Sequence, residues 1–269
     1  MFWIYHLPLW LMALLFCVLF LGLTWLGLIV VRPLVQPWAG SEKEWNHIMG
    51  HIIAGHGVLY GILLALLSLA ALENRDSLVD AVGREAASLG SLYRDASGYP
   101  EPLRSEMRTS LRDYCTYVIE VAWPAQKRGG IPTTGVERMN AIQTRLFTFE
   151  PQSKSQELLH AQTLYQFNQF IEARRLRISR AEHALPKPMW WVVAAGALLG
   201  IVLSLLLHLS RFSAHLILAS SLSLMTALVI FLLVALDQPL RGGVQVTPEA
   251  FEILRHNLMD ATAQGGDSH

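Results

Sequence analysis

The sequence predicts an all-α polytopic membrane protein with four transmembrane helices and a helical cytoplasmic domain between the second and the third. Hydrophobic residues make up 52% of the 269 positions, which is more than an ordinary soluble domain carries. Four stretches contain no Asp, Glu, Lys or Arg, and each is long enough to cross the ~30 Å hydrocarbon core of a bilayer as a helix. The apolar residues between the second and third stretches recur at helical spacing.

The charge-free stretches divide the chain into two transmembrane pairs, a middle domain and a tail. The N-terminal stretch is expected to remain as an anchor, because no Lys or Arg precedes Arg32 and no small-x-small cleavage site follows the stretch. The predicted segments are a first pair within 1–73 (spans at about 8–31 and 48–72), a domain at 74–187, a second pair at 188–236 (spans at about 189–209 and 212–236) and a tail at 237–269.

The middle domain, residues 74–187, holds 16 Lys and Arg and 13 Asp and Glu, so most of the charge lies there. Its apolar residues recur every three or four positions, as on the buried face of a helix. Breaks are expected at Tyr99–Pro102, at Gly129–Pro132, near Pro151 and at Pro186. The predicted apolar positions are Leu78, Val82, Leu89, Leu92 and Ala96; Leu103, Met107, Leu111, Cys115, Val118 and Ala122; and Leu158, Ile171 and Ile178.

Lys and Arg near the ends of the spans predict the orientation. Eight lie on the side of the middle domain and three on the other, and the positive-inside rule then places the N-terminus, the domain and the tail in the cytoplasm. We therefore expect a multi-pass protein of the cell inner membrane. The Arg-rich stretch 174–180 is expected to be a solvated face near anionic lipid headgroups.

The second span carries small residues on one helical face. In lipid such a face allows two helices to approach closely, either within a chain or between subunits. In the second case the opposite, apolar face would line a hydrophobic constriction of a pore. The third span carries a shorter version of the stripe, so these two helices are expected to pack together. The helix-packing residues are Gly50, Ala54, Gly57, Gly61, Ala65, Ser68, Gly196 and Gly200, and the apolar pore candidates are Ile52, Leu59, Leu63 and Leu66.

A few polar residues in and beside the spans are candidates for an ion path. His56 is an ionisable group inside the second span, although a neutral histidine can also bond across helices. Glu73 and Asp237 close the second and fourth spans. A ring of such carboxylates would favour cations, whereas the same groups paired to Arg75, Arg177 or Arg180 would be neutral anchors.

No catalytic or cofactor-binding pattern is apparent. There is no Walker loop, dinucleotide fingerprint, HExxH or nucleophile elbow, and an enzyme is not expected. His47 and His51 lie one helical turn apart and could share a metal, but no Cys or carboxylate completes a set at nearby spacing, so no metal or other cofactor is expected. The 21 Lys and Arg equal the 21 Asp and Glu, which argues against a nucleic-acid partner.

Several motifs resemble the bacterial bestrophin-like domain family, in the same order along the chain. They are Gly50, Gly57-Val58-Leu59-Tyr60-Gly61-Ile62-Leu63-Leu64-Ala65, Glu73-Asn74, Glu85-Ala86, Leu92-Tyr93-Arg94-Asp95-Ala96, Pro100-Glu101-Pro102-Leu103-Arg104, Trp123-Pro124, Leu236-Asp237-Gln238-Pro239 and Val246-Thr247-Pro248-Glu249-Ala250-Phe251. Leu72 departs from the family, which often has Trp there.

The resemblance implies a likeness to bestrophins, which are pentameric anion channels with four spans and a helical cytoplasmic domain. A bestrophin-type Ca²⁺ site would need a dense acidic cluster after the last span, and residues 237–243 contain one carboxylate, Asp237, so calcium gating is not expected. We expect a homo-oligomer surrounded by lipid that passes ions along the second span, and the resemblance implies that these ions are anions. The alternative is a non-conducting scaffold or sensor whose cytoplasmic domain binds a partner.

Overall fold

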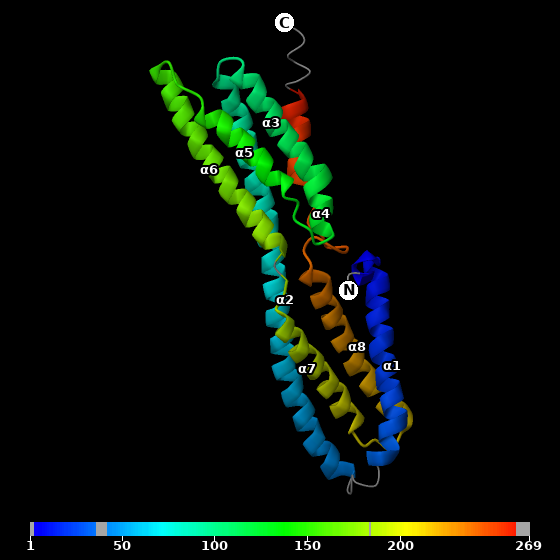
Figure 1. Cartoon of the computed structure of the whole chain (residues 1–269). Coiled ribbons are helices and arrows are strands. Elements are labelled where there is room, and N and C mark those ends of the chain that lie inside the picture. The colour runs from blue at the N-terminus through cyan, green and yellow to red at the C-terminus, as the bar shows by residue number, and fades with distance from the viewer. Residues whose placement is uncertain (1–2, 36–41, 183, 262–269) are drawn as a thin grey trace. The chain divides into compact units, whose positions relative to one another are not determined.

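The computed structural model describes residues 3–35, 42–182 and 184–261, and all regular structure in these ranges is helical (Figure 1). The prediction of an all-α protein is confirmed. The long helices are α1 (Leu9–Val35), α2 (Glu42–Asp95), α3 (Leu103–Tyr117), α5 (Thr134–Phe147), α6 (Lys154–Glu182), α7 (Lys187–Leu205) and α8 (Phe212–Asp237). The short ones are η1 (Trp3–His6), η2 (Ala96–Gly98), η3 (Val118–Ala122), α4 (Trp123–Lys127), α9 (Glu249–Leu254) and η4 (Arg255–Asp260).

The chain forms two compact units. The membrane unit comprises Met1–Glu73 and Ala184–Gln245, and the helical unit comprises Asn74–His183 and Val246–His269. The predicted tail at 237–269 is thus divided: its residues up to Gln245 belong to the membrane unit, and those from Val246 belong to the helical unit. Residues 262–269 lie outside the described part of the chain.

Four helices, α1, α2, α7 and α8, are long and apolar enough to cross a membrane, as predicted. The second of them differs from the expected pattern of a span at 48–72 followed by a separate helix. Instead, α2 is one helix of 54 residues. The reason lies in the local sequence: no Gly or Pro occurs between Gly61 and Gly83, so nothing near Glu73 ends the helix.

The third span also ends earlier than predicted, at Leu205 instead of residue 209. Side chains of α2 form hydrogen bonds with the backbone groups that follow the end of α7. Trp45 Nε1 donates to the carbonyl of Leu206 over 2.7 Å, and Asn46 bonds both the carbonyl and the N–H of His208. Because the orphan groups of a helix end need partners, these bonds allow α7 to stop and the chain to turn into α8.

Within the membrane unit, α1 and α8 lie side by side (Figure 1). Polar side chains join them: Thr24 and Ser223 share a buried hydrogen bond of 2.5 Å, and Trp25 Nε1 donates to Ser220 Oγ over 2.9 Å. Hydrogen bonds across helices stabilise packing in lipid, where apolar contact gives little preference between helix and tail.

In the helical unit, the predicted core of α2 and α3 is confirmed, since Leu78, Val82, Leu89, Leu92 and Ala96 are all at most 2% exposed. Met107, Leu111, Cys115, Val118 and Ala122 are also buried, whereas Leu103, predicted in the same set, is half-buried. Burial raises the pKa of the Cys115 thiol to about 12.

The predicted apolar face of α6 is wrong at its start, because Leu158 is 64% exposed. The buried face instead contains Phe167, Phe170 and Arg177. An arginine in this register breaks the apolar pattern, which is why the sequence indicated a different face.

Arg177 is the buried charge around which the helical unit packs, and not the solvated side chain that was expected. It is 2% exposed, and its Nε donates to Glu85 Oε2 of α2 over 2.5 Å. Its Nη1 donates to Gln126 Oε1 over 2.8 Å. Tyr114 of α3 completes the cluster, because its hydroxyl donates to Glu85 Oε1 over 2.6 Å. Every oxygen of the Glu85 carboxylate therefore has a donor, as a buried charge requires.

The electrostatics follow from this geometry. Burial by itself would lower the pKa of Arg177, but the adjacent Glu85 carboxylate has the opposite effect, and the net shift is upward. The guanidinium therefore stays charged. Burial raises the pKa of Tyr114 well above its usual value, and the negative charge of Glu85 contributes to the same shift. Tyr114 therefore remains a neutral hydroxyl that donates its proton to Glu85.

The C-terminal segment belongs to this core. The ring of Phe251 in α9 lies beneath the Arg177 guanidinium, 6.0 Å from it, with the Trp123 ring at 5.8 Å. The Cys115 thiol donates to the Phe251 carbonyl over 3.5 Å, and Arg112 donates to the Met259 carbonyl. Residues 246–261 are thus an integral part of the helical unit.

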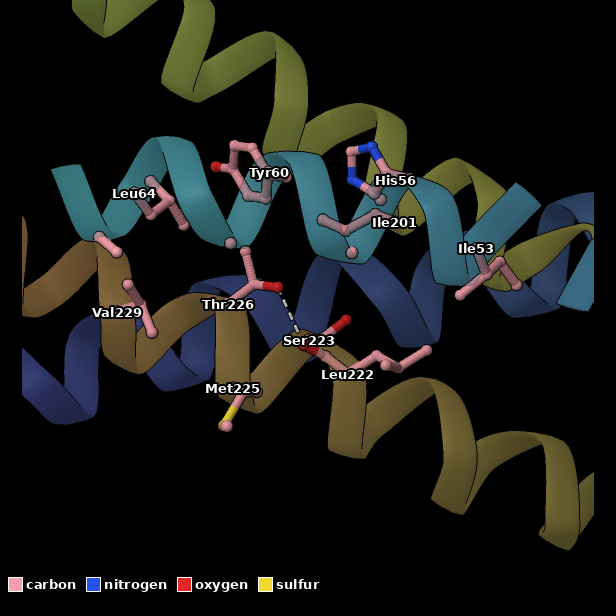
Figure 2. Close-up of a pocket in the computed structure, with 14 residues that line it drawn as sticks. Ile53, His56, Tyr60, Leu64, Ile201, Leu222, Ser223, Met225, Thr226 and Val229 are labelled. Carbon is pink, nitrogen blue, oxygen red and sulfur yellow. Dashed lines mark hydrogen bonds between the residues drawn. The ribbon is translucent and has the colours of Figure 1, made fainter. Parts of the chain in front are cut away.

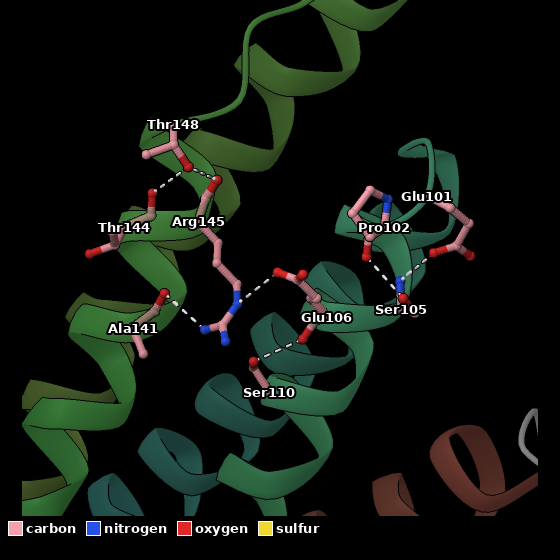
Figure 3. Close-up of polar contacts among 9 residues, drawn as sticks. All are labelled: Glu101, Pro102, Ser105, Glu106, Ser110, Ala141, Thr144, Arg145 and Thr148. Atoms are coloured by element: carbon pink, nitrogen blue, oxygen red, sulfur yellow. Dashed lines mark hydrogen bonds and ion pairs between the residues drawn. The ribbon is translucent and has the colours of Figure 1, made fainter.

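The outer surface of α3 and α5 has exposed polar contacts (Figure 3). Arg145 pairs with Glu106 over 3.3 Å, and Glu101 accepts the N–H of Ser105 in the first turn of α3. The bonds from Ser105 lower the pKa of Glu101. Exposed ion pairs contribute little to stability, so the buried Glu85 pair is the stronger constraint.

We expect Arg177→Met to destabilise the helical unit by about 3–5 kcal/mol, because it leaves the Glu85 carboxylate buried without a counter-charge. Amide hydrogen exchange of α3 and α6 peptides should report the loss locally. The double variant Glu85→Gln with Arg177→Met should recover most of it, since the new amide still accepts the Tyr114 proton. Equal exchange in the wild type and Arg177→Met would contradict the role of the pair.

Candidate functional site

The candidate site is the part of α2 within the membrane unit, which meets the rest of the chain along one face. Leu64, Leu67 and Ala71 are buried on this face. Tyr60 donates from its hydroxyl to the carbonyl of Val193 in α7 over 2.8 Å. The His56 ring stacks on the Tyr60 ring, with centroids 5.3 Å apart.

Bulky residues of α2 lie over the glycines of α7. A Cβ on Gly196 would clash with the Tyr60 ring, and one on Gly200 would lie 3.0 Å from His56 Nε2. The two helices therefore pack together, but through large residues of α2 on small residues of α7. His56 is thus half-buried against α7.

The small residues of α2 itself have no such partner within the described chain. A Cβ added to Gly50, Gly57 or Gly61 would meet nothing within 4 Å, and Ala54 and Ala65 are exposed. Ser68, which follows these residues on the same face towards the C-terminal end of α2, is half-buried. The structure thus brings Gly196 and Gly200 into a helix contact and leaves most of the stripe on α2 open.

The apolar pore candidates fall into two groups. Leu63 is half-buried against the membrane core. Ile52, Leu59 and Leu66, spaced seven residues apart, are 43%, 74% and 60% exposed. A further exposed set, Val58, Ile62 and Leu69, was not singled out in the sequence analysis, because exposure in lipid leaves no polar signal in the sequence.

A cavity of about 430 Å³ lies between α2, α7 and α8, and the open stripe borders it at Gly57, Gly61 and Ala65. Figure 2 shows Ser223 and Thr226 on the side of α8 that faces α2. Thr226 Oγ1 donates to the Leu222 carbonyl within α8, and Ser223 is bonded to Thr24 of α1, so both hydroxyls already have partners in the protein. The cavity is accordingly apolar in character, and it suits aliphatic side chains or lipid tails.

The two carboxylates at the span ends have different surroundings. Asp237 is 7% exposed, and its Oδ1 accepts the backbone N–H of Leu185 over 2.8 Å, so it fixes the segment that leads into α7. Glu73 is exposed at the end of the membrane part of α2. Among the arginines proposed as partners, Arg75 pairs with Asp76 and Arg177 with Glu85.

A model of the bestrophin-like domain matches residues 18–251, which is most of the chain. The chain belongs to the bestrophin-like family. It is a membrane protein. No curated protein matches it at a significant level.

Solved structures match across nearly the whole length. Two crystal structures of a bacterial bestrophin homologue from Klebsiella pneumoniae, each with one substitution, have TM-scores of 0.65 and 0.66 at 11% identity. The alignments cover 91% and 92% of this chain and 98% and 99% of theirs. A crystal structure of a membrane protein has a TM-score of 0.65 at 10% identity, covering 93% of this bestrophin-like chain and 98% of its own. These likenesses show the fold.

The packing of the Tyr60 ring against α7 can be tested with two glycine variants. We expect Gly196→Ala to lower stability by about 1–3 kcal/mol, because its Cβ overlaps the Tyr60 ring. Gly55→Ala is the matched control, since a Cβ there meets nothing within 4 Å. Thermal unfolding of the purified protein in detergent measures both. A Gly196→Ala midpoint equal to that of Gly55→Ala would show that the contact is unimportant.

Proposed function

We propose that this bestrophin-like chain forms a homo-oligomeric ion channel of the inner membrane, with α2 lining the pore and the helical unit in the cytoplasm. One observation carries the proposal: among the described residues, α2 packs on α7 along one face, borders a cavity towards α8 with its glycine stripe, and leaves the rest of its apolar surface exposed. A transmembrane helix that is packed along one face only has room for a neighbouring subunit on each flank and a pore in front.

The helical wheel supports this arrangement. At 100° per residue, Val58, Ile62 and Leu69 lie opposite the inward face of Tyr60 and Leu67. The glycine stripe lies a quarter turn to one side of this front face. The line of Ile52, Leu59 and Leu66 lies a quarter turn to the other side.

Two different flanks suit a cyclic oligomer. In a ring each subunit presents one surface to the subunit before it and another to the subunit after it. Large exposed side chains on one flank, as at Leu59 and Leu66, complement open glycines on the other, as at Gly57 and Gly61. This geometry favours Val58, Ile62 and Leu69 as the pore face, with the sequence candidates Ile52, Leu59 and Leu66 at the subunit contact.

Two features bear on the identity of the ion. The resemblance to bestrophins favours anions. Glu73, however, follows Ile62 and Leu69 on the same side of α2 and is exposed, and a ring of carboxylates would favour cations. Ion selectivity is therefore the measurement that separates the two.

We expect Gly61→Leu to disrupt the oligomer while the chain still folds, because the site is open within the subunit and would be filled in the ring. Native mass spectrometry gives the subunit number, and circular dichroism checks the helix content. Gly22→Leu in α1, where a Cβ also meets nothing within 4 Å, is the matched control. A Gly61→Leu protein with the wild-type subunit number would contradict the proposed contact.

Reconstituted liposomes should carry a current above that of empty vesicles. The reversal potential under a KCl gradient then reports whether K⁺ or Cl⁻ passes, and Glu73→Gln should shift it towards Cl⁻ if the carboxylate faces the pore. An intact oligomer that passes neither ion would overturn the channel and favour the non-conducting scaffold, in which the helical unit binds a partner.

A further inference from the structure

The first turns of α2 carry a pair of histidines on an exposed face. The rings of His47 and His51 have centroids 4.7 Å apart and are tilted by 57°. Both side chains are exposed. Histidines four residues apart on a helix lie one turn above each other, so two imidazoles can reach the same ion.

The hydrogen bond of His51 sets its tautomer. Its Nδ1 lies 2.7 Å from the carbonyl oxygen of His47, and because a carbonyl can only accept, Nδ1 carries the proton. Nε2 is then the unprotonated nitrogen with a free lone pair. A ligating histidine typically donates its other ring N–H to a carbonyl or carboxylate in this way, which fixes the ring and raises its basicity.

The rotation of this end of α2 keeps the pair outward. Trp45 and Asn46 bond the backbone of Leu206 and His208 after α7, so their side of the helix is occupied. His47 and His51 lie on the other side. Glu44 is exposed one turn before His47, but no group of three donors gathers within the described residues.

We propose that His47 and His51 form an exchangeable site for a divalent transition-metal ion such as Cu²⁺, Ni²⁺ or Zn²⁺. The expectation of no metal came from the lack of a complete set of protein ligands. A closed structural site needs such a set, but an exchangeable site needs two imidazoles, with water in the remaining positions. The nitrogen ligands select these ions over Mg²⁺ and Ca²⁺, which prefer oxygen.

The site exists in each chain, whether or not the protein conducts ions. Its consequence for transport rests on the proposed function. His51 lies on the same side of α2 as Val58 and Leu69, seven and eighteen residues along the helix, so a ring of subunits would gather one site per chain near the pore entrance. A metal ion bound there would oppose the passage of cations.

Calorimetric titration of the full-length protein, purified in detergent with a tag that lacks histidine, tests the site with Cu²⁺, Ni²⁺ and Zn²⁺. We expect about one ion per chain, tightest for Cu²⁺. His47→Ala and His51→Ala should each weaken binding at least about tenfold, because either change removes the second ligand of the chelate. His256→Ala, which removes an exposed histidine of the helical unit, should bind as the wild type does.

Electron paramagnetic resonance of bound Cu²⁺ should show two equatorial imidazole nitrogens in the wild type and one in either single variant. Wild-type affinity in His47→Ala or His51→Ala, or no saturable binding at all, would overturn the proposal. Because binding is measured without transport, a protein that binds metal but carries no current retains the site and refutes only the channel.

Discussion

The contact of Tyr60 and His56 with the glycines of α7 fixes the rotation of α2 about its own axis. The hydroxyl bond from Tyr60 to the Val193 carbonyl, together with the close approach to Gly196 and Gly200, leaves one orientation of the helix. In lipid this constraint is needed, because apolar burial does not distinguish one face of such a helix from another. The glycine stripe, the apolar front and the histidine pair are exposed because this one face is occupied.

The same helix contributes to two separate cores. Leu64, Leu67 and Ala71 belong to the membrane unit, and Leu78 and Val82 to the helical unit. Beyond Leu78 the helix holds Glu85, whose carboxylate is bonded by Arg177 and Tyr114. Because no helix breaker occurs near Glu73, one continuous helix supplies core residues to both units.

The sequence predicted the features that depend on local pattern. The four spans follow from charge-free length, and the buried faces of α2 and α3 follow from periodicity. Partners could not be predicted in the same way. The small residues of α2 and α7 indicate helix faces, but they do not indicate what packs on each face. In the structure the Tyr60 ring packs on Gly196, whereas nothing lies within 4 Å of a Cβ built on Gly57. Arg177 was read as solvated because its partner Glu85 lies 92 residues away, and only the fold brings the two charges together.

Three carboxylates, Glu73 and Glu85 of α2 and Asp237 at the end of α8, have distinct surroundings. Glu85 is neutralised by a buried arginine, and Asp237 is held by the Leu185 N–H. Of these three, Glu73 is the exposed one. A charge acts on a passing ion only where neither a counter-ion nor burial cancels it. If the chain conducts ions as proposed, any influence of these three groups on permeation therefore comes from Glu73.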